Sequence, residues 1–169
     1  MSILTISNKK EEAKLRQKTV PLIFKDHTRK EIQELINKMR KIMIEANGIG
    51  LAANQIGLNL QMFVARAPDN DGKMKFYSIF NPIITKTSKE TLILTEGCLS
   101  VPGLIGDVER APKIMLSGFD KLGKPIKIKA WGLLAHIFQH EVDHLNGIVF
   151  IDKAKKTYDA LMNKDIETK

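Results

Sequence analysis

The sequence has little cysteine, few aromatic side chains and no long apolar run. Its single cysteine, Cys98, cannot form an internal disulfide, so the sequence fits a reducing compartment and leaves this thiol free for other chemistry. No segment approaches the roughly 18 apolar residues that a membrane-spanning helix needs, and residues 1–8 lack the basic and apolar regions of a signal peptide. We therefore expect a protein that is neither exported nor bound in a membrane.

Acidic residues are the scarcer charge, with 19 Asp and Glu against 27 Lys and Arg, which gives a net charge of +8. Such an excess raises non-specific affinity for polyanions but does not define a fold or a chemistry. The lysines are scattered and aromatic residues make up only 6%, so the pattern favours solvated faces over a dedicated nucleic-acid surface. A chain of 169 residues can bury a full core, and we expect a single domain over residues 1–169.

Two segments have the apolar periodicity of helices. The first runs from Thr28 to Asn47, with a Thr28–Glu31 capping box at its start and Gly48 as a stop signal. The second runs from Leu133 to Leu145 and is apolar nearly all round, which predicts a buried helix.

The segment between these helices has the composition of β-strands. Because no helices alternate with the strands, antiparallel pairing is favoured over a parallel sheet. Residues 120–123 predict a hairpin loop, residues 148–151 a short strand, and the tail over 152–169 carries Ala154, Tyr158, Leu161 and Met162 at helical spacing. The predicted strands are 61–65, 76–80, 91–94, 113–119 and 125–130.

The sharpest local signal is His140-Glu141-Val142-Asp143-His144, an H-E-x-x-H pattern within the second predicted helix. Residues four apart share a helix face, so both imidazoles can bind one metal ion while Glu141 handles a proton. The histidines share the apolar face of Leu133 and Ile137, where unpaired imidazoles would be costly. The pattern therefore predicts a metal site.

A metal site of this kind needs a third ligand. His136 lies about 12 Å from His144 along the helix axis, so these two histidines cannot share one ion. The extended metalloprotease pattern requires a histidine where this chain has Phe150. The third ligand is thus a carboxylate from elsewhere or the thiolate of Cys98.

A glycine-containing segment, Gly48-Ile49-Gly50-Leu51-Ala52-Ala53-Asn54-Gln55, follows the first helix. Its two glycines allow positive φ or close approach to a ligand. It fits neither a P-loop nor a dinucleotide-binding fingerprint.

Together with Glu96-Gly97-Cys98-Leu99-Ser100 and Gln139 to Leu145, this segment resembles the peptide deformylase family, whose members carry G-x-G-L-A-A-x-Q, E-G-C-L-S and Q-H-E-x-D-H-L in this order. The resemblance is strongest over residues 19–150. It implies an α+β fold in which antiparallel β-sheets pack around a central helix that carries H-E-x-x-H. It also implies a metal-dependent hydrolase that releases formate from N-formyl-methionine of newly made polypeptides.

The resemblance assigns roles to individual residues. Cys98, His140 and His144 would bind one divalent metal ion per chain, Fe(II) by family resemblance, with zinc, nickel or cobalt also compatible with the donor set. Glu141 would act as general base and acid. The Gln55 side chain and the backbone N–H of Leu99 would stabilise the oxyanion.

Other residues are candidates for binding the substrate. Nascent N-formyl-methionyl peptides are the expected partners, the ribosome is expected to be near, and the chain is expected to be a monomer in the bacterial cytoplasm, or in an organelle if the source is eukaryotic. The candidate substrate-binding residues are Ile49, Gly50, Leu94, Gly97, Leu133 and Ile137.

The sequence departs from the family at three places. Residues 103–106 lack the arginine that some bacterial members carry in this loop, His136 stands where some have an apolar residue, and the terminal helix is reduced to a weak stretch. Two other functions compete with a deformylase. A metallopeptidase would need Glu167 as its third ligand, and a metal-stabilised RNA- or ribosome-binding module would give Glu141 no task.

Overall fold

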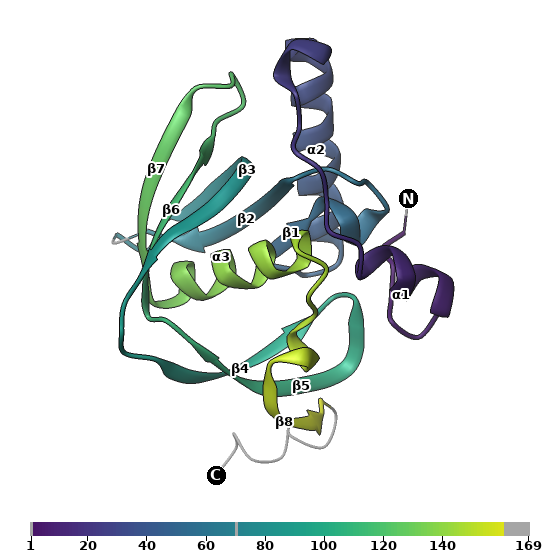
Figure 1. Ribbon diagram of the computed structural model, residues 1–169, viewed down its shortest axis with the longest axis vertical. Helices are drawn as coiled ribbons and strands as arrows, with labels where there is room; N and C mark the ends of the chain where they lie inside the picture. The colour runs from purple at the N-terminus through teal and green to yellow at the C-terminus, as the bar shows by residue number, and fades with distance from the viewer. Residues whose placement is uncertain (1, 70, 161–169) are drawn as a thin grey trace.

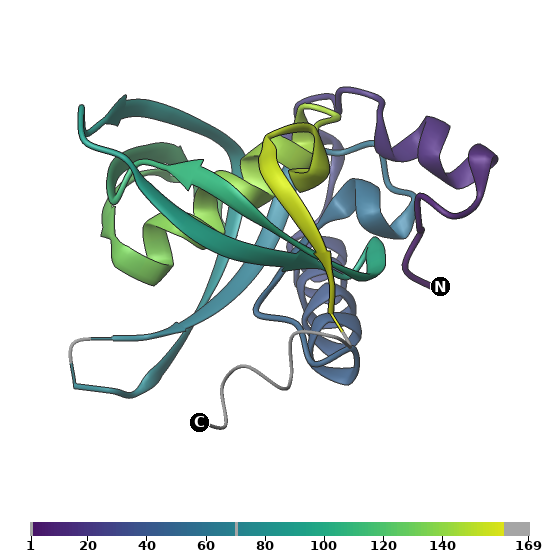
Figure 2. The same cartoon turned by 90° about the horizontal axis from the view of Figure 1, so that it is seen from below.

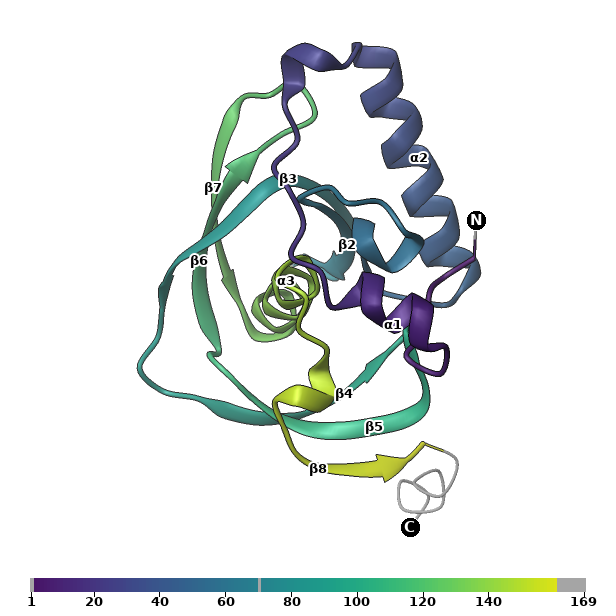
Figure 3. The same ribbon diagram turned by 45° about the vertical axis from the view of Figure 1, so that its right-hand side comes forward.

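Two antiparallel sheets surround a central helix, α3 (Gly132–Leu145), in the computed structural model, which describes residues 2–69 and 71–160 (Figure 1). Figure 3 looks nearly along α3 and shows the larger sheet on one side, the smaller sheet below it, and the N-terminal helices on the remaining side. The predicted α+β class and the antiparallel pairing are confirmed.

The larger sheet has five strands in the order β1-β2-β3-β6-β7, so β1 and β7 are its edges. The predicted loop at 120–123 joins β6 to β7, and the Asp120 carboxylate accepts hydrogen bonds from the backbone N–H groups of Leu122 and Lys124. The strands of this sheet are β1 Gly50–Ala52, β2 Met62–Pro68, β3 Met74–Thr87, β6 Lys113–Phe119 and β7 Pro125–Trp131.

The smaller sheet has three strands in the order β4-β5-β8, and its edge strand β4 runs beside α3 (Figure 2). Its core is a small cluster of four buried residues, whereas the larger sheet contributes to two much larger clusters that include α2 and α3. The strands of this sheet are β4 Leu92–Cys98, β5 Val101–Arg110 and β8 Ala154–Asp159.

Helix α2 (Arg29–Glu45) confirms the helix predicted from Thr28. Thr28 accepts a hydrogen bond from the backbone of Glu31, and the Glu31 carboxylate accepts one from Thr28 in return. The helix ends at Glu45, and Asn47 instead of Gly48 takes the positive φ, at 56°. Asparagine tolerates this conformation better than most residues.

Two predictions for the C-terminal part are wrong. Residues 150–152 form a 3-10 helix, η3 (Phe150–Asp152), because the Asp152 carboxylate accepts a hydrogen bond from the backbone of Val149. The segment with helical spacing forms strand β8, in which Tyr158 pairs with Ile105 of β5. Leu161 and Met162 lie outside the described residues.

Five elements have no counterpart in the sequence prediction. Strand β5 covers residues 103–106, which were expected to be a loop, because it pairs with β4 on one side and β8 on the other. The other four elements that were not predicted are α1 Lys9–Leu15, η1 Phe24–Asp26, η2 Ala53–Ile56 and strand β1.

No helix of the described residues is long and apolar enough to span a membrane.

Candidate metal centre

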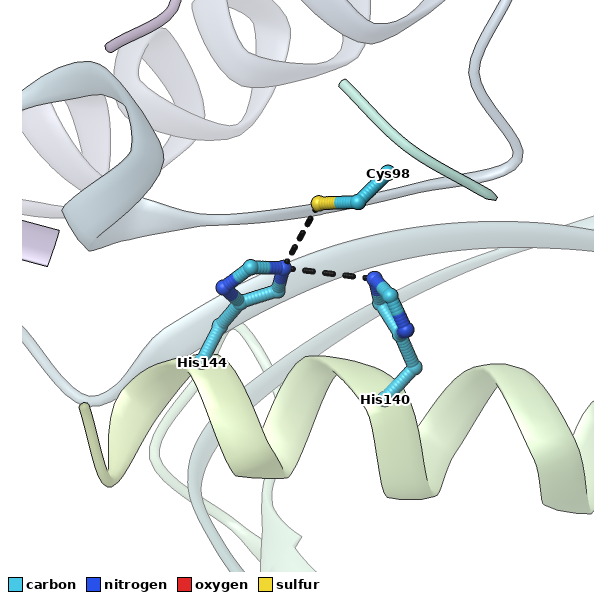
Figure 4. Close-up of side chains that lie close together, drawn as sticks. All are labelled: Cys98, His140 and His144. Atoms are coloured by element: carbon cyan, nitrogen blue, oxygen red, sulfur yellow. Dashed lines mark hydrogen bonds between the residues drawn. The ribbon is translucent and has the colours of Figure 1, made fainter. Parts of the chain in front are cut away.

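Cys98 at the end of β4 faces His140 and His144 on α3 (Figure 4). Nε2 of His144 lies 3.1 Å from Sγ of Cys98 and 3.2 Å from Nε2 of His140. One ligand atom from each of the three residues lies within 4.8 Å of the others. The structure therefore brings together the two histidines of the motif and the lone thiol.

The protonation states of these groups fit a bound cation. Nδ1 of His140 lies 2.7 Å from the Glu96 carboxylate, and an ionised carboxylate can only accept, so this nitrogen carries a proton and Nε2 is the atom left to offer a lone pair to a cation. Burial, followed by the nearby His140, lowers the pKa of His144 well below its ordinary value, so its ring is neutral at pH 7. Two lone pairs and a sulfur at this separation are the donor set of a divalent metal ion.

The Cys98 thiol must lose its proton to bind a cation. Burial raises the pKa of Cys98 to about 12, so the thiol is protonated at neutral pH in the ion-free chain. Binding of an ion at this site is then coupled to release of a proton.

Glu96 on β4 holds the first histidine in place. Its side chain is 1% exposed and accepts hydrogen bonds from Arg110 at 2.6 and 3.0 Å, from His140 at 2.7 Å and from His136 at 3.1 Å. Burial alone would raise the pKa of Glu96, but the hydrogen bonds from His136, His140 and Arg110 outweigh it and hold this pKa well below its ordinary value. Arg110 in turn pairs with Asp143 of α3, which links the smaller sheet to the central helix.

We expect Glu96→Gln to weaken metal binding by about 10- to 100-fold, because an amide would no longer fix the tautomer of His140. The measurement is a metal titration of the folded variant, with circular dichroism to establish folding. Asp143→Asn is the matched control, because the Asp143 carboxylate pairs with Arg110 and Lys153 and not with a histidine in the described structure. Equal metal affinity of Glu96→Gln and wild type would contradict the assignment.

Glu141 lies beside the three donors and is buried, at 3% exposed. Burial, reinforced by the negative charge of Glu96, raises its pKa well above its ordinary value. One of its carboxylate oxygens has no hydrogen-bond partner among the described residues. A Cβ on Gly50 would overlap the carboxylate of Glu141, so only glycine allows strand β1 to pass this close.

Gln55 in η2 approaches the centre from the larger sheet. Its Oε1 accepts a hydrogen bond from the backbone of Ala52 at 2.8 Å, which fixes the orientation of the amide. Its Nε2 lies 3.1 Å from Oγ of Ser100 and 3.6 Å from Sγ of Cys98. The amide thus presents an N–H donor beside the metal ligands.

A cavity of about 170 Å³ opens onto these residues, and its wall includes Gln55, Leu99 and Glu141. Among the predicted substrate-binding residues, Ile137 is buried in its wall, whereas Ile49 and Leu133 are 44% and 51% exposed at its rim. Gly50 and Gly97 also line it, whereas Leu94, on β4 and 38% exposed, does not.

The prediction missed Thr95, Glu96 and His136 in the cavity wall, and Arg110 behind it. Glu96 carried a usable signal, because a carboxylate two residues before a metal-binding cysteine on a strand points to the same side as that cysteine. Arg110 and His136 come into contact with Glu96 only through the tertiary fold, so no local pattern in the sequence indicates them.

The comparisons with known proteins agree with this geometry. The model of the polypeptide deformylase family matches residues 1–160. The peptide deformylase of Thermodesulfovibrio yellowstonii is 38% identical over 170 residues, which cover 100% of this chain and 99% of that one. Among solved structures, a probable peptide deformylase from synechococcus phage S-SSM7 is 38% identical, with a TM-score of 0.81 over 90% of this chain and 99% of that one.

A second solved structure is the class I type b peptide deformylase from Acinetobacter baumannii with Met-Ala-Ser bound. It is 29% identical, with a TM-score of 0.81 over 90% of this chain and 97% of that one.

The fold and the site together define a metal-dependent hydrolase. The sheets pack around a helix that carries two histidines, a thiol faces these histidines, and a buried carboxylate lies beside them. The motifs, the fold and the relatives narrow this class. The chain belongs to the polypeptide deformylase family, the metal-dependent enzymes that remove the N-formyl group from nascent peptides.

Proposed function

We propose that Cys98, His140 and His144 hold one Fe(II) ion beside which the formyl group of N-formyl-methionyl peptides is hydrolysed. The observation that carries the proposal is the convergence of Sγ and two Nε2 atoms at the end of a cavity where the Glu141 carboxylate has an oxygen without a partner in the described structure. Zinc, nickel or cobalt also suit one thiolate and two imidazoles, and resemblance to the family favours iron.

When bound, the ion would supply Lewis-acid chemistry and would lower the pKa of a water molecule toward neutrality. Glu141 would take up a proton from the water molecule that attacks the formyl carbon. Glu141 then donates the proton to the leaving amine, so that formate and a free N-terminal methionine are the products. A carboxylate with a raised pKa suits both transfers, because it is a stronger base toward water than an ordinary carboxylate and can still donate its proton to an amine.

The Nε2–H of Gln55 and the backbone N–H of Leu99 stabilise the negative charge that develops on the formyl oxygen. The amide of Gln55 is held by Ala52 and Ser100 before substrate arrives, so no reorganisation is needed during the reaction. Such preorganised donors are among the larger contributions to catalysis.

We expect Gln55→Glu to lower kcat by about 10²- to 10³-fold with the metal retained, because glutamate keeps the acceptor for Ala52 but loses the donor. Steady-state kinetics and metal analysis of the same preparation provide the test. Ser100→Ala removes a partner of Gln55 but leaves the amide, so this control should lose much less activity. A similar kcat for Gln55→Glu and wild type would remove Gln55 from the oxyanion site.

The substrate backbone is proposed to lie between two open sheet edges. Strand β1 is an edge of the larger sheet and β4 an edge of the smaller one, and both flank the cavity. An extended peptide can add to such edges through main-chain hydrogen bonds while its first side chain enters the cavity. The Acinetobacter baumannii relative was solved with the tripeptide Met-Ala-Ser bound, a short peptide that begins with methionine.

We propose further that the enzyme acts as a monomer and close to the ribosome, where nascent chains emerge. Its compartment would be the bacterial cytoplasm, or an organelle for a eukaryotic source. Bacterial and chloroplast relatives are compatible with both compartments.

The test is formate release from an N-formyl-methionyl tripeptide by protein purified without oxygen and loaded with Fe(II) or nickel. We expect turnover that disappears after chelation and returns with the ion. A longer unformylated peptide should stay uncut, which distinguishes a deformylase from a metallopeptidase. Absence of formate from the metal-replete chain would overturn the proposal.

A further inference from the structure

A second cavity, of about 490 Å³, adjoins the cavity of the metal centre, and Leu133 lines both. Its lining comes from β7 and the start of α3 and from the end of β2 and the start of β3. We call it the distal groove and define it by Lys75, Tyr77, Ile128, Lys129, Trp131 and Leu134.

The only tryptophan of the chain, Trp131, lies at this groove and is 57% exposed. Tryptophan is highly buried on average, and a large exposed aromatic side chain beside a cavity is typical of a binding surface. Trp131 directly precedes Gly132, which begins α3 with φ at 56°, so its backbone is held at the junction of strand and helix.

The lining of the distal groove combines apolar side chains with a few charged ones, and Tyr77 is held by its neighbours. Tyr77 contacts Phe138 of α3 edge-to-face with ring centroids 5.4 Å apart, and Nζ of Lys75 lies 5.4 Å from the centroid of the Tyr77 ring. Lys75, Lys129 and Asp69 are the charged residues of the lining. This composition suits an apolar or aromatic side chain better than a phosphate backbone, which would favour a wholly basic lining.

We propose that the distal groove binds the part of the substrate chain that lies several residues beyond the formylated methionine, with an apolar side chain packed on Trp131. The inference rests on the proposed function and extends it from the first residues of the substrate to its downstream segment. Continuity supports it, because Leu133 forms the boundary between the two cavities. The cavity at the metal centre, at about 170 Å³, is suited to one side chain, so the rest of the peptide needs another surface.

The kinetic test compares a formylated tripeptide with two formylated octapeptides, one with phenylalanine and leucine in its second half and one with glycine and serine there. We expect the apolar octapeptide to have a KM five- to tenfold below that of the other two substrates. Trp131→Ala should remove this difference while kcat and the KM of the tripeptide stay within twofold of wild type. Ile83→Ala, a large exposed apolar residue on the same sheet outside the groove, is the matched control and should behave as wild type.

The binding test uses Trp131 as its own probe, because it is the only tryptophan. The unformylated apolar octapeptide should shift the emission of the metal-loaded protein to shorter wavelength, and the tripeptide should not. Equal KM values for the three substrates, an equal effect of Trp131→Ala on all of them, or a shift produced by an oligonucleotide but by neither octapeptide would overturn the inference. Turnover of the tripeptide by wild type tests the deformylase proposal separately, so failure of one is distinguishable from failure of the other.

Discussion

Replacement of Glu141 by glutamine is expected to lower kcat for formate release by about 10²- to 10⁴-fold while one metal ion per chain is retained. Glutamine has the shape of glutamate, so it fits against Gly50, but it cannot take up a proton at neutral pH. The loss should appear in kcat with little change in KM, because the carboxylate acts on the reacting atoms and not on the bound peptide. Stopped-time formate assays with metal analysis of each preparation are the measurement.

Glu141→Ala is the second variant for this site, because it removes the acid without adding an amide. Both variants should bind the metal as wild type does, since neither removes a proposed ligand. A variant that kept near-normal turnover would assign proton transfer to another group and would favour a binding module that tolerates the change.

Replacement of Cys98 by alanine is expected to weaken metal binding by about two orders of magnitude or more and to reduce turnover to background. Two imidazoles four residues apart would remain, and they lack the anionic ligand that the thiolate provides. Equilibrium dialysis against Fe(II) or zinc, without oxygen, gives the number of ions per chain.

His136→Ala provides the control for this experiment. His136 lines the same cavity and contacts Glu96, but it is not in the group of three donors, so this variant should retain one ion per chain. Full metal occupancy of Cys98→Ala would exclude the thiolate as a ligand and would indicate that the third ligand is a carboxylate.

Local signals predicted the two longer helices, α2 and α3, well. The Thr28–Glu31 capping box located the start of α2, and apolar periodicity located α3 to within one residue. Strand β8 was misread as helical because Ala154 and Tyr158 are four residues apart, a spacing that also places both on one face of a strand. Pairing with the distant β5 decided between the two, and a single sequence does not contain that pairing.

In the candidate site, too, local patterns predicted some features and long-range contacts decided the others. The spacing of His140 and His144 predicted a shared face from helix geometry alone, whereas the choice of Cys98 required resemblance to a family. The position of Glu96 depends on Arg110, fourteen residues away, and on a helix that begins far along the chain. Interactions of this kind are set by tertiary packing, which no local pattern encodes.

The proposed ligands come from two layers that share little core. Cys98 belongs to the smaller sheet, whose own buried cluster has four residues, whereas both histidines belong to the central helix. An ion held between them would act as a cross-link and would stabilise the native state by about 2.7 kcal/mol at a free concentration 100 times its Kd. Cells starved of the metal would then lose the enzyme through proteolysis of a loosened fold as well as through inactivity, so the abundance of this protein would follow the supply of that metal without any dedicated regulator.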